Sequence, residues 1–292
     1  MKERLAAWAK DIERELSGFC EPEAPEYEEF SRMLGYGLLG GGKRLRGGLL
    51  LAAYETMGGD GEDGEALRYA AALECIHAFS LIHDDLPSMD DADTRRGKPA
   101  HHKAYGEGMA VLSGDALLAI AAERMIVKAS EAMVFERMKR RVDAARAVLT
   151  AAGMRGIAVG QYLDMVGTGS VRWKDGGIED RAALLEDIDR RKTAEMFRAA
   201  AEAGFRLAGA SESEIEAAVS FGLKLGMLYQ LRDDLQDADT DKGQITWPVV
   251  YGINESKRKA EEWERAALAA LWKLGGRGAP LAQFVEMMRE FA

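Results

Sequence analysis

Residues 117–125, LLAIAAERM, set the pattern that most of the chain follows. Apolar side chains recur there at spacings of three and four residues, which is the spacing of one face of an α-helix. The six prolines all lie outside residues 100–247, so long helices are possible across that span. Because segments with alternating β-branched residues are hard to find, we expect an all-α protein.

Glycine-rich stretches divide this helical pattern into segments. We expect breaks at residues 57–64, at residues 167–177, around Gly209 and at residues 274–278. These breaks are too short to be interdomain linkers, and no internal repeat of fixed period is evident. The sequence therefore predicts a single domain over residues 1–292, built as a bundle of about ten or more helices.

Two local patterns predict how particular helices begin and pack. Ser211 followed by Glu214 is typical of a capping box that opens a helix. Gly153, Gly156 and Gly160 would lie at i, i+3 and i+7 of one helical segment. Because glycine inside a helix costs about 1 kcal/mol unless packing requires it, this spacing predicts a close crossing of two helices.

Composition excludes several classes of protein. A hydrophobic content of 47% argues against disorder, and a net charge of −10 argues against a nucleic-acid binder, whose contact surface is basic. No segment approaches the roughly 20 uninterrupted apolar residues of a membrane span. Acidic residues near the N-terminus do not fit a signal peptide, and two cysteines without metal spacing fit a reducing compartment. We therefore expect a soluble, cytoplasmic protein.

Two aspartate clusters, DDLPSMDDAD at residues 84–93 and DDLQD at residues 233–237, follow apolar helical segments. Asp233 and Asp237 are four residues apart, so their carboxylates share a helix face, and Gln230 lies one turn earlier. Hard oxygen ligands in this number suit Mg²⁺, which combines one or two carboxylates with the oxygens of a phosphate substrate. The alternative is a pair of solvated acidic helix ends.

The first cluster requires a break in its helix. Asp84 and Asp90 are six residues apart, which would separate them on an ideal helix. Pro87 lies between them, so a helix that ends there would let Asp90 return towards Asp84. His77, nearly two turns before Asp84, shares the face of that aspartate.

Basic residues stand close to these aspartates in the sequence. The stretch GGGKRLRGG, residues 40–48, contains Lys43, Arg44 and Arg46, and Arg95 and Arg96 directly follow the first cluster. Arginine and lysine are the usual phosphate-binding side chains. In an acidic chain this combination predicts a site for an anion together with metal ions, although Arg95 and Arg96 could also simply neutralise the neighbouring aspartates.

Two other interpretations fit less well. Residues 37–44, GLLGGGKR, approach a nucleotide-binding P-loop, but Arg44 replaces the required Ser or Thr. A histidine–aspartate phosphohydrolase would use several of the four histidines, at residues 77, 83, 101 and 102. Helical spacing places only His77 on the same face as Asp84.

Taken together, the motifs resemble those of the all-trans isoprenyl diphosphate synthases of the polyprenyl synthetase family, in particular the bacterial short-chain farnesyl and geranylgeranyl diphosphate synthases. The resemblance covers residues 34–252 and rests on GGGKRLRG, ALECIHAFSLIHDDLPSMDDADTRRGKPAHH, LSGDALL, GMRGIAVGQYLDM, RRKTAEMFRAA and YQLRDDLQD, in the order of the family. It implies a bundle of long helices around a central cavity, a homodimer, three Mg²⁺ ions, and condensation of isopentenyl diphosphate with dimethylallyl or geranyl diphosphate, releasing diphosphate.

The resemblance also implies roles for individual residues. The expected metal ligands are Asp84, Asp90, Asp233 and Asp237, with Asp85 in support. The allylic diphosphate would contact Arg95, Lys192 and Gln230, and Thr193 and Gln230 would lie near the carbocation. The pocket for isopentenyl diphosphate would contain Lys43, Arg46, His77 and Arg96.

The length of the product is expected to depend on Phe79 and Ser80, five and four residues before Asp84. An aromatic ring there would stop chain growth early, so we expect a C15 product, farnesyl diphosphate, ahead of C20; alternatively, Phe79 only packs in the core. The loop after the second cluster is shorter than is usual in the family, with Gln244 where a lysine is expected and Lys242 as a candidate substitute. The chain also lacks the usual basic C-terminal end. Both departures predict weaker closure over the diphosphates.

Three further functions remain open. The first is a geranylgeranyl diphosphate synthase, which makes a C20 product. The second is an enzyme of the same fold that ionises a finished prenyl diphosphate to make a terpene, which would not need the isopentenyl diphosphate pocket. The third is a non-catalytic partner subunit, in which the loss of an aspartate motif is expected, whereas both are present here.

Overall fold

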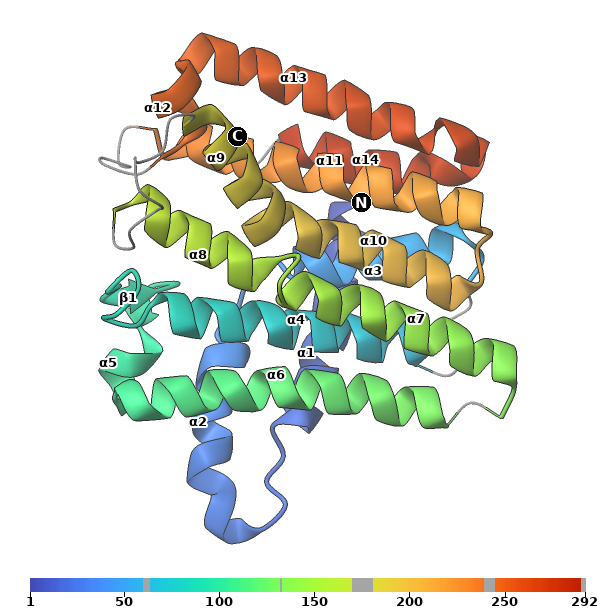
Figure 1. Ribbon diagram of the computed structural model, residues 1–292. Helices are drawn as coiled ribbons and strands as arrows, with labels where there is room; N and C mark the ends of the chain where they lie inside the picture. The colour runs from blue at the N-terminus through green and yellow to red at the C-terminus, as the bar shows by residue number, and fades with distance from the viewer. Residues whose placement is uncertain (60–63, 132, 170–180, 239–244, 290–292) are drawn as a thin grey trace. The chain divides into compact units, whose positions relative to one another are not determined.

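The computed structural model describes residues 1–59, 64–131, 133–169, 181–238 and 245–289 (Figure 1). Nearly all of them are helical, and the prediction of an all-α protein is confirmed. The chain divides into two compact units. The N-terminal unit comprises Lys2–Leu51 and Asp60–Ala145, and the C-terminal unit comprises Ala52–Gly59 and Arg146–Ala292 together with Met1. The expectation of a single domain around a central cavity stays a prediction.

The N-terminal unit is built around one buried helix. Its elements are α1 (Lys2–Phe19), η1 (Pro25–Tyr27), α2 (Glu28–Leu38), the first part of α3 (Leu45–Thr56), α4 (Glu65–Asp84), β1 (Thr94–Arg95), β2 (Lys98–Pro99), α5 (His101–Tyr105), α6 (Glu107–Ser130) and the first part of α7 (Phe135–Ala152). Most residues of helix α4 are buried, and it packs against α6, α1 and α2, as expected for a helix in the centre of a core. In Figure 1, α4 and α6 lie side by side.

The C-terminal unit is built around α11. Its elements are the remainders of α3 and α7, then α8 (Ile157–Gly167), α9 (Arg181–Asp189), η2 (Arg190–Ala194), α10 (Glu195–Ala208), α11 (Glu212–Gln236), α12 (Trp247–Tyr251), α13 (Ile253–Ala270), η3 (Leu271–Gly278) and α14 (Ala279–Met288). Helix α11 packs between α10 and α13 (Figure 1). The predicted capping box is confirmed, because Ser211 N and Oγ both donate to Glu214 Oε2, at 2.8 and 2.7 Å.

The expected helix breaks agree with the observed ends. Helix α3 ends at Thr56, α8 ends at Gly167, and α10 ends before Gly209, which has a φ of 79°. A left-handed glycine after the last turn is a common way to end a helix. The break at residues 274–278 coincides with the non-helical Gly275 inside η3.

Close helix packing at glycine is confirmed at one of the three expected positions. A Cβ on Gly160 of α8 would lie 2.5 Å from the backbone nitrogen of Lys192. The prediction that all three glycines belong to one helix is wrong, since α7 ends at Ala152 and α8 begins at Ile157. The turn between them is closed by a hydrogen bond from Gly156 N to Gly153 O, 3.0 Å.

Among the described residues, no helix is both long enough and apolar enough to cross a membrane.

Candidate active site

The first aspartate cluster folds back on itself where α4 ends. Asp84 is the last residue of α4, and Pro87 follows three residues later. The backbone nitrogen of Asp90 donates to the carbonyl oxygen of Asp84 at 2.9 Å, and that of Ala92 donates to Asp85 at 3.2 Å. The predicted return of Asp90 to Asp84 is therefore confirmed at the level of the backbone.

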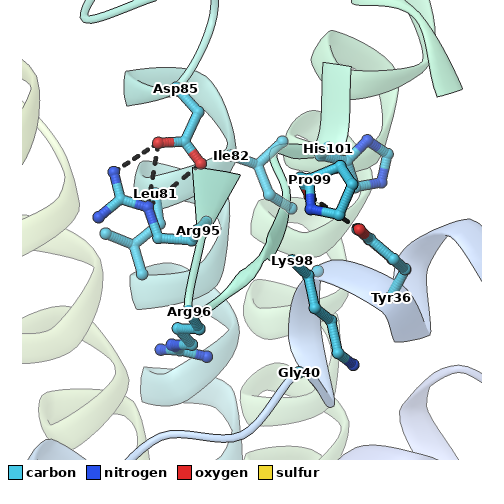
Figure 2. Close-up of a pocket in the computed structure, with 11 residues that line it drawn as sticks. Tyr36, Gly40, Leu81, Ile82, Asp85, Arg95, Arg96, Lys98, Pro99 and His101 are labelled. Atoms are coloured by element: carbon cyan, nitrogen blue, oxygen red, sulfur yellow. Dashed lines mark hydrogen bonds and ion pairs between the residues drawn. The ribbon is translucent and has the colours of Figure 1, made fainter. Parts of the chain in front are cut away.

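Asp85 is directed towards the arginine that follows the cluster. Its carboxylate is only 2% exposed and forms an ion pair with Arg95, whose Nε lies 3.0 Å from Oδ1 and 3.2 Å from Oδ2 (Figure 2). This hydrogen bonding raises the pKa of Arg95 further above its ordinary value. Asp85 therefore fixes the direction of Arg95, and its support of a metal ion stays a prediction.

A small β-hairpin, which the sequence analysis missed, presents Arg95 and Arg96. Strands β1 and β2 pair in antiparallel register, with Arg95 opposite Lys98. Arg96 and Gly97 form the turn with φ values of 52° and 74°, and two consecutive positive values are typical of a tight hairpin turn. The guanidinium of Arg96 donates to the carbonyl oxygen of Gly41, which ties the hairpin to the glycine-rich loop.

Three of the four residues expected to bind isopentenyl diphosphate lie together in the N-terminal unit. Arg46 Nη1 donates to His77 Nε2 at 3.4 Å. Desolvation, followed by the positive charges of Arg46, Arg96 and other arginines, lowers the pKa of His77 well below its ordinary value. At neutral pH His77 is therefore an uncharged imidazole among guanidinium groups. The fourth residue, Lys43, is exposed in the glycine-rich loop, residues 39–44, which directly precedes α3 and Arg46.

Arg44 has a different role from its basic neighbours. It is buried with a φ of 48°, its Nη1 lies 3.6 Å from Glu74 Oε2, and its Nη2 donates to the carbonyl oxygen of Leu38 at 2.7 Å. The other carboxylate oxygen of Glu74 accepts from the backbone nitrogen of Gly47 at 2.9 Å. This buried pair braces the glycine-rich loop. The signal that could have revealed it is Glu74 itself, because a charge inside an otherwise apolar helix requires a partner.

A cavity of about 40 Å³ lies behind the hairpin. It is lined by Tyr36, Ile82, Arg95, Arg96, Lys98 and His101, among others (Figure 2). The hydroxyl of Tyr36 donates to the carbonyl oxygen of Pro99 at 2.7 Å and so holds β2 against α2.

The second aspartate cluster ends α11 in the C-terminal unit. Asp233 and Asp237 are exposed, whereas Asp234 between them is buried. Asp234 Oδ1 accepts from Gln230 Nε2 at 2.8 Å, and its Oδ2 accepts from the backbone nitrogen of Trp247 at 3.0 Å. The predicted pairing of Asp233 and Asp237 on one helix face agrees with their common exposure.

Lys192 and Thr193 lie in η2, a π-helical turn between α9 and α10. Such turns are frequent at functional sites. Thr193 Oγ1 donates to Gln230 Oε1 at 2.8 Å, and Lys192 Nζ lies 2.7 Å from Asp164 Oδ2. Three expected site residues, Lys192, Thr193 and Gln230, thus lie within one hydrogen-bonded region, and Asp164 is an addition that the sequence analysis did not predict.

The side chains of Phe79 and Ser80 make different contacts. The ring of Phe79 packs edge-on against His83 with centroids 5.7 Å apart, and His83 Nε2 donates to Val111 O of α6 at 3.1 Å. The hydroxyl of Ser80 donates back to the carbonyl oxygen of His77 at 2.9 Å. Phe79 therefore lies on the side of α4 that faces α6, and its effect on product length stays a prediction.

The donor chemistry of both clusters fits Mg²⁺. Among the described residues, no group of three or more His, Cys, Asp or Glu side chains gathers closely enough to hold a metal ion alone. Asp84 with Asp90, and Asp233 with Asp237, instead offer pairs of carboxylates. Mg²⁺ commonly binds through one or two carboxylates, waters and substrate phosphates, so these pairs suit it.

The model of the polyprenyl synthetase family matches residues 27–269 of this chain. The chain belongs to the polyprenyl synthetase family. It is accordingly an enzyme of the short-chain trans-prenyltransferase class, as the motifs indicated.

The chain is similar to plant sequences named as geranylgeranyl pyrophosphate synthases and to solved bacterial structures. Geranylgeranyl pyrophosphate synthase 11 and geranylgeranyl pyrophosphate synthase 12 of Arabidopsis thaliana, both chloroplastic, are each 42% identical over 250 residues, which cover 81% of this chain and 67% and 66% of the relatives. The chain thus spans about two thirds of their length. The solved structure of an FPP/GFPP synthase from Zymomonas mobilis is 30% identical with a TM-score of 0.85, covering 98% of this chain and 99% of that chain. A geranyltransferase from Legionella pneumophila is 28% identical with a TM-score of 0.84, covering 99% and 96%.

Two departures from the family pattern lie at least partly outside the described residues. Lys242 and Gln244 of the shortened loop belong to residues 239–244, and the C-terminal end includes residues 290–292. Their predicted effect on closure over the diphosphates stays a prediction.

Proposed function

We propose that this polyprenyl synthetase condenses isopentenyl diphosphate with dimethylallyl and then geranyl diphosphate, giving all-trans farnesyl diphosphate and releasing diphosphate at each step. The observation that supports it most is the grouping of Arg46, His77 and Arg96 around the glycine-rich loop, beside the aspartates that end α4. An enzyme that joins two diphosphate substrates needs a second group of cations to bind the second diphosphate. An enzyme that acts on one diphosphate does not.

The residues match the charges that the reaction develops. When the allylic C–O bond breaks, negative charge grows on the departing diphosphate, and Arg95 and Lys192, which the family resemblance assigns to this substrate, would neutralise it. Mg²⁺, bound by Asp84, Asp90, Asp233 and Asp237, would supply further neutralisation; three ions are expected from the family resemblance.

The carbon–carbon bond forms without a protein nucleophile. The double bond of isopentenyl diphosphate supplies the electron pair to the allylic cation, and the resulting cation then loses a proton, for which the released diphosphate is the expected acceptor. The oxygen atoms of Thr193 and Gln230 would stabilise the allylic cation by their dipoles. Lys43, Arg46, His77 and Arg96 would hold isopentenyl diphosphate through its own diphosphate.

The C20 product, geranylgeranyl diphosphate, is the second candidate. It is favoured by the names of the relatives that are 42% identical, which are geranylgeranyl pyrophosphate synthases. The C15 product is favoured by the aromatic ring of Phe79, one to two turns before the first metal ligand.

The function is tested by incubating the purified protein with Mg²⁺, radiolabelled isopentenyl diphosphate, and dimethylallyl or geranyl diphosphate. We expect labelled C15 product, and a Phe79→Ala variant that yields longer chains. Incorporation of label with a C20 end point would replace the farnesyl assignment. Absence of incorporation with either primer would reject the synthase, and a hydrocarbon formed from farnesyl diphosphate alone would identify a terpene cyclase. Activity that appears only after a second synthase is added would identify a partner subunit.

A homodimer is supported by the surface of α6. Val111, Leu112, Ile126 and Val127 are exposed along this helix, the most exposed of them at 60%. Several large apolar side chains on one exposed helix are typical of a protein interface, and the family resemblance makes a second copy the expected partner. Light scattering after size-exclusion chromatography measures the mass directly. The cytoplasmic location expected from the sequence stays a prediction.

A further inference from the structure

Trp247 and Asp189 form a buried contact in the same unit as the second aspartate cluster. Trp247 is completely buried, and its indole Nε1 donates to Asp189 Oδ2 at 2.5 Å. Its ring stacks on Tyr251 with centroids 5.0 Å apart and an interplanar angle of 18°. Both polar partners are buried, so each depends on the other for its hydrogen bond.

The contact continues into the expected site. The backbone nitrogen of Trp247 donates to Asp234, Gln230 donates to the other oxygen of Asp234, and Thr193 donates to Gln230. These bonds measure 3.0, 2.8 and 2.8 Å. Because Asp189 directly precedes the π-helical turn η2 and Thr193 lies within it, the chain of hydrogen bonds starts and finishes within five consecutive residues.

This network determines which aspartates of α11 face outward. Both oxygens of Asp234 accept hydrogen bonds from buried or half-buried donors. If Asp234 turned outward, these donors would lose their partners, and an unpaired buried donor is costly. The inward position of Asp234 therefore leaves Asp233 and Asp237 on the exposed side of the helix.

We propose that Asp189 and Trp247 are positioning residues of this active site. They hold η2, the end of α11 and the start of α12 together, and so fix the Thr193–Gln230 pair and the outward direction of Asp233 and Asp237. The proposal rests on the proposed function for its effect on catalysis, but not for its effect on local structure.

Three variants separate this role from a general contribution to stability. Trp247→Phe removes the indole donor and keeps an aromatic ring and the backbone nitrogen. Asp189→Asn keeps an oxygen that accepts from the indole, whereas Asp189→Leu does not. Trp272→Phe is the control, since Trp272 is 88% exposed. Circular dichroism selects a temperature at which every variant is folded.

Catalysis is the first readout. We expect kcat of Trp247→Phe and of Asp189→Leu to fall at least ~10-fold, since a small displacement of a reacting group lowers the rate steeply. The KM for isopentenyl diphosphate should stay within about twofold, because its expected pocket lies in the other unit. Asp189→Asn and Trp272→Phe should stay close to the unmodified enzyme. Lowered melting temperatures with unchanged kcat would overturn the proposal.

Two readouts do not depend on turnover. Binding of Mn²⁺ in the presence of pyrophosphate, followed by electron paramagnetic resonance, should weaken in Trp247→Phe and Asp189→Leu and stay unchanged in the control. The indole N–H signal that disappears in Trp247→Phe should exchange slowly with solvent, and faster in Asp189→Leu. If the unmodified protein fails to incorporate isopentenyl diphosphate, the proposed function fails while these readouts still test the network. Unchanged Mn²⁺ affinity and indole exchange in the variants would reject the network itself.

Discussion

The two aspartate pairs, Asp84–Asp85 and Asp233–Asp234, have the same order but are held differently. In each pair the second aspartate is directed inward and bound within its own unit. Asp85 binds the charged guanidinium of Arg95, whereas Asp234 binds two neutral donors, an amide side chain and a backbone nitrogen. The first pair thus fixes a cation, Arg95, through Asp85. The second pair fixes the side chain of Gln230 and the backbone of Trp247 through Asp234.

The third aspartate is also positioned differently in the two clusters. Helix α4 stops at the first pair, and a turn after Pro87 returns Asp90 to Asp84. Helix α11 continues for another turn, so Asp237 follows Asp233 at helical spacing. Geometry made by a turn depends on a few local hydrogen bonds, whereas geometry made by a helix depends on the packing of that helix.

The largest expected effect comes from removing the first aspartate of either pair, which the resemblance assigns as a metal ligand. Asp233→Asn and Asp84→Asn should each lower kcat about 10²- to 10³-fold, the usual effect of removing one charge-stabilising group. The melting temperature of Asp233→Asn should not change, because its side chain is exposed. Steady-state kinetics with geranyl diphosphate measures the effect, and Asp11→Asn in α1 is the control. An effect of Asp233→Asn below tenfold would contradict the equal status of the two pairs.

Packing beneath the second cluster gives the next effect. A Cβ on Gly226 of α11 would lie 2.4 Å from the Cα of Ala194 in η2. Gly226→Ala should therefore lower the free energy of unfolding by about 1–3 kcal/mol, as overpacking does, and should disturb Thr193. Urea denaturation measures the difference. Gly108→Ala in α6 is a matched control, because nothing lies within 4 Å of the added methyl group; that variant should be as stable as the original or more so.

A smaller effect is expected at the first pair. Asp85→Asn removes the charge that holds Arg95, and should lower the free energy of unfolding by about 1–2 kcal/mol; the 40% exposure of Arg95 limits the loss because water replaces part of the interaction. The KM for the allylic diphosphate should rise as Arg95 loses its fixed direction. Asp93→Asn, an exposed aspartate bound to Lys103 in the same segment, should change neither quantity.

The smallest expected effect is a pH dependence at the start of α11. Hydrogen bonds from Ser211 and then Arg277 lower the pKa of Glu214 from 4.5 to about 2. A carboxylate with a lowered pKa in the folded state stabilises the protein fully above pH 4.5, and this stabilisation is lost as the pH falls towards 2. The melting temperature of Glu214→Gln should thus fall below that of the original protein at pH 6, with a difference that shrinks below pH 4.5. A constant difference across this range would exclude the carboxylate as its source.

Local features of the fold could be predicted from the sequence. The helix breaks, the capping box of Ser211 and Glu214, and the return of Asp90 all depend on residues close to one another along the chain. The break after Ala152 was missed because the three glycines fit helical spacing, whereas the chain turns at Gly153, where the backbone nitrogen of Gly156 donates to its carbonyl oxygen.

Features of the site that depend on distant contacts could not be predicted. Glu74 lies 27 residues from Gly47, and Trp247 lies 58 residues from Asp189. Periodicity carries no information about such pairs. The hairpin of β1 and β2 was missed for another reason, since its turn uses a positive φ at Arg96, a residue that seldom adopts one.

The π-helical turn η2 makes this active site sensitive to chain length at one point. A π-turn is in effect an α-helix with one residue inserted, and each residue of an α-helix rotates the next part of the chain by about 100°. Deleting a single residue between Arg190 and Ala194 would restore a regular helix from α9 into α10 while turning one of them by more than a quarter of a circle. Substitutions are therefore tolerated more easily in this turn than the insertion or deletion of a residue.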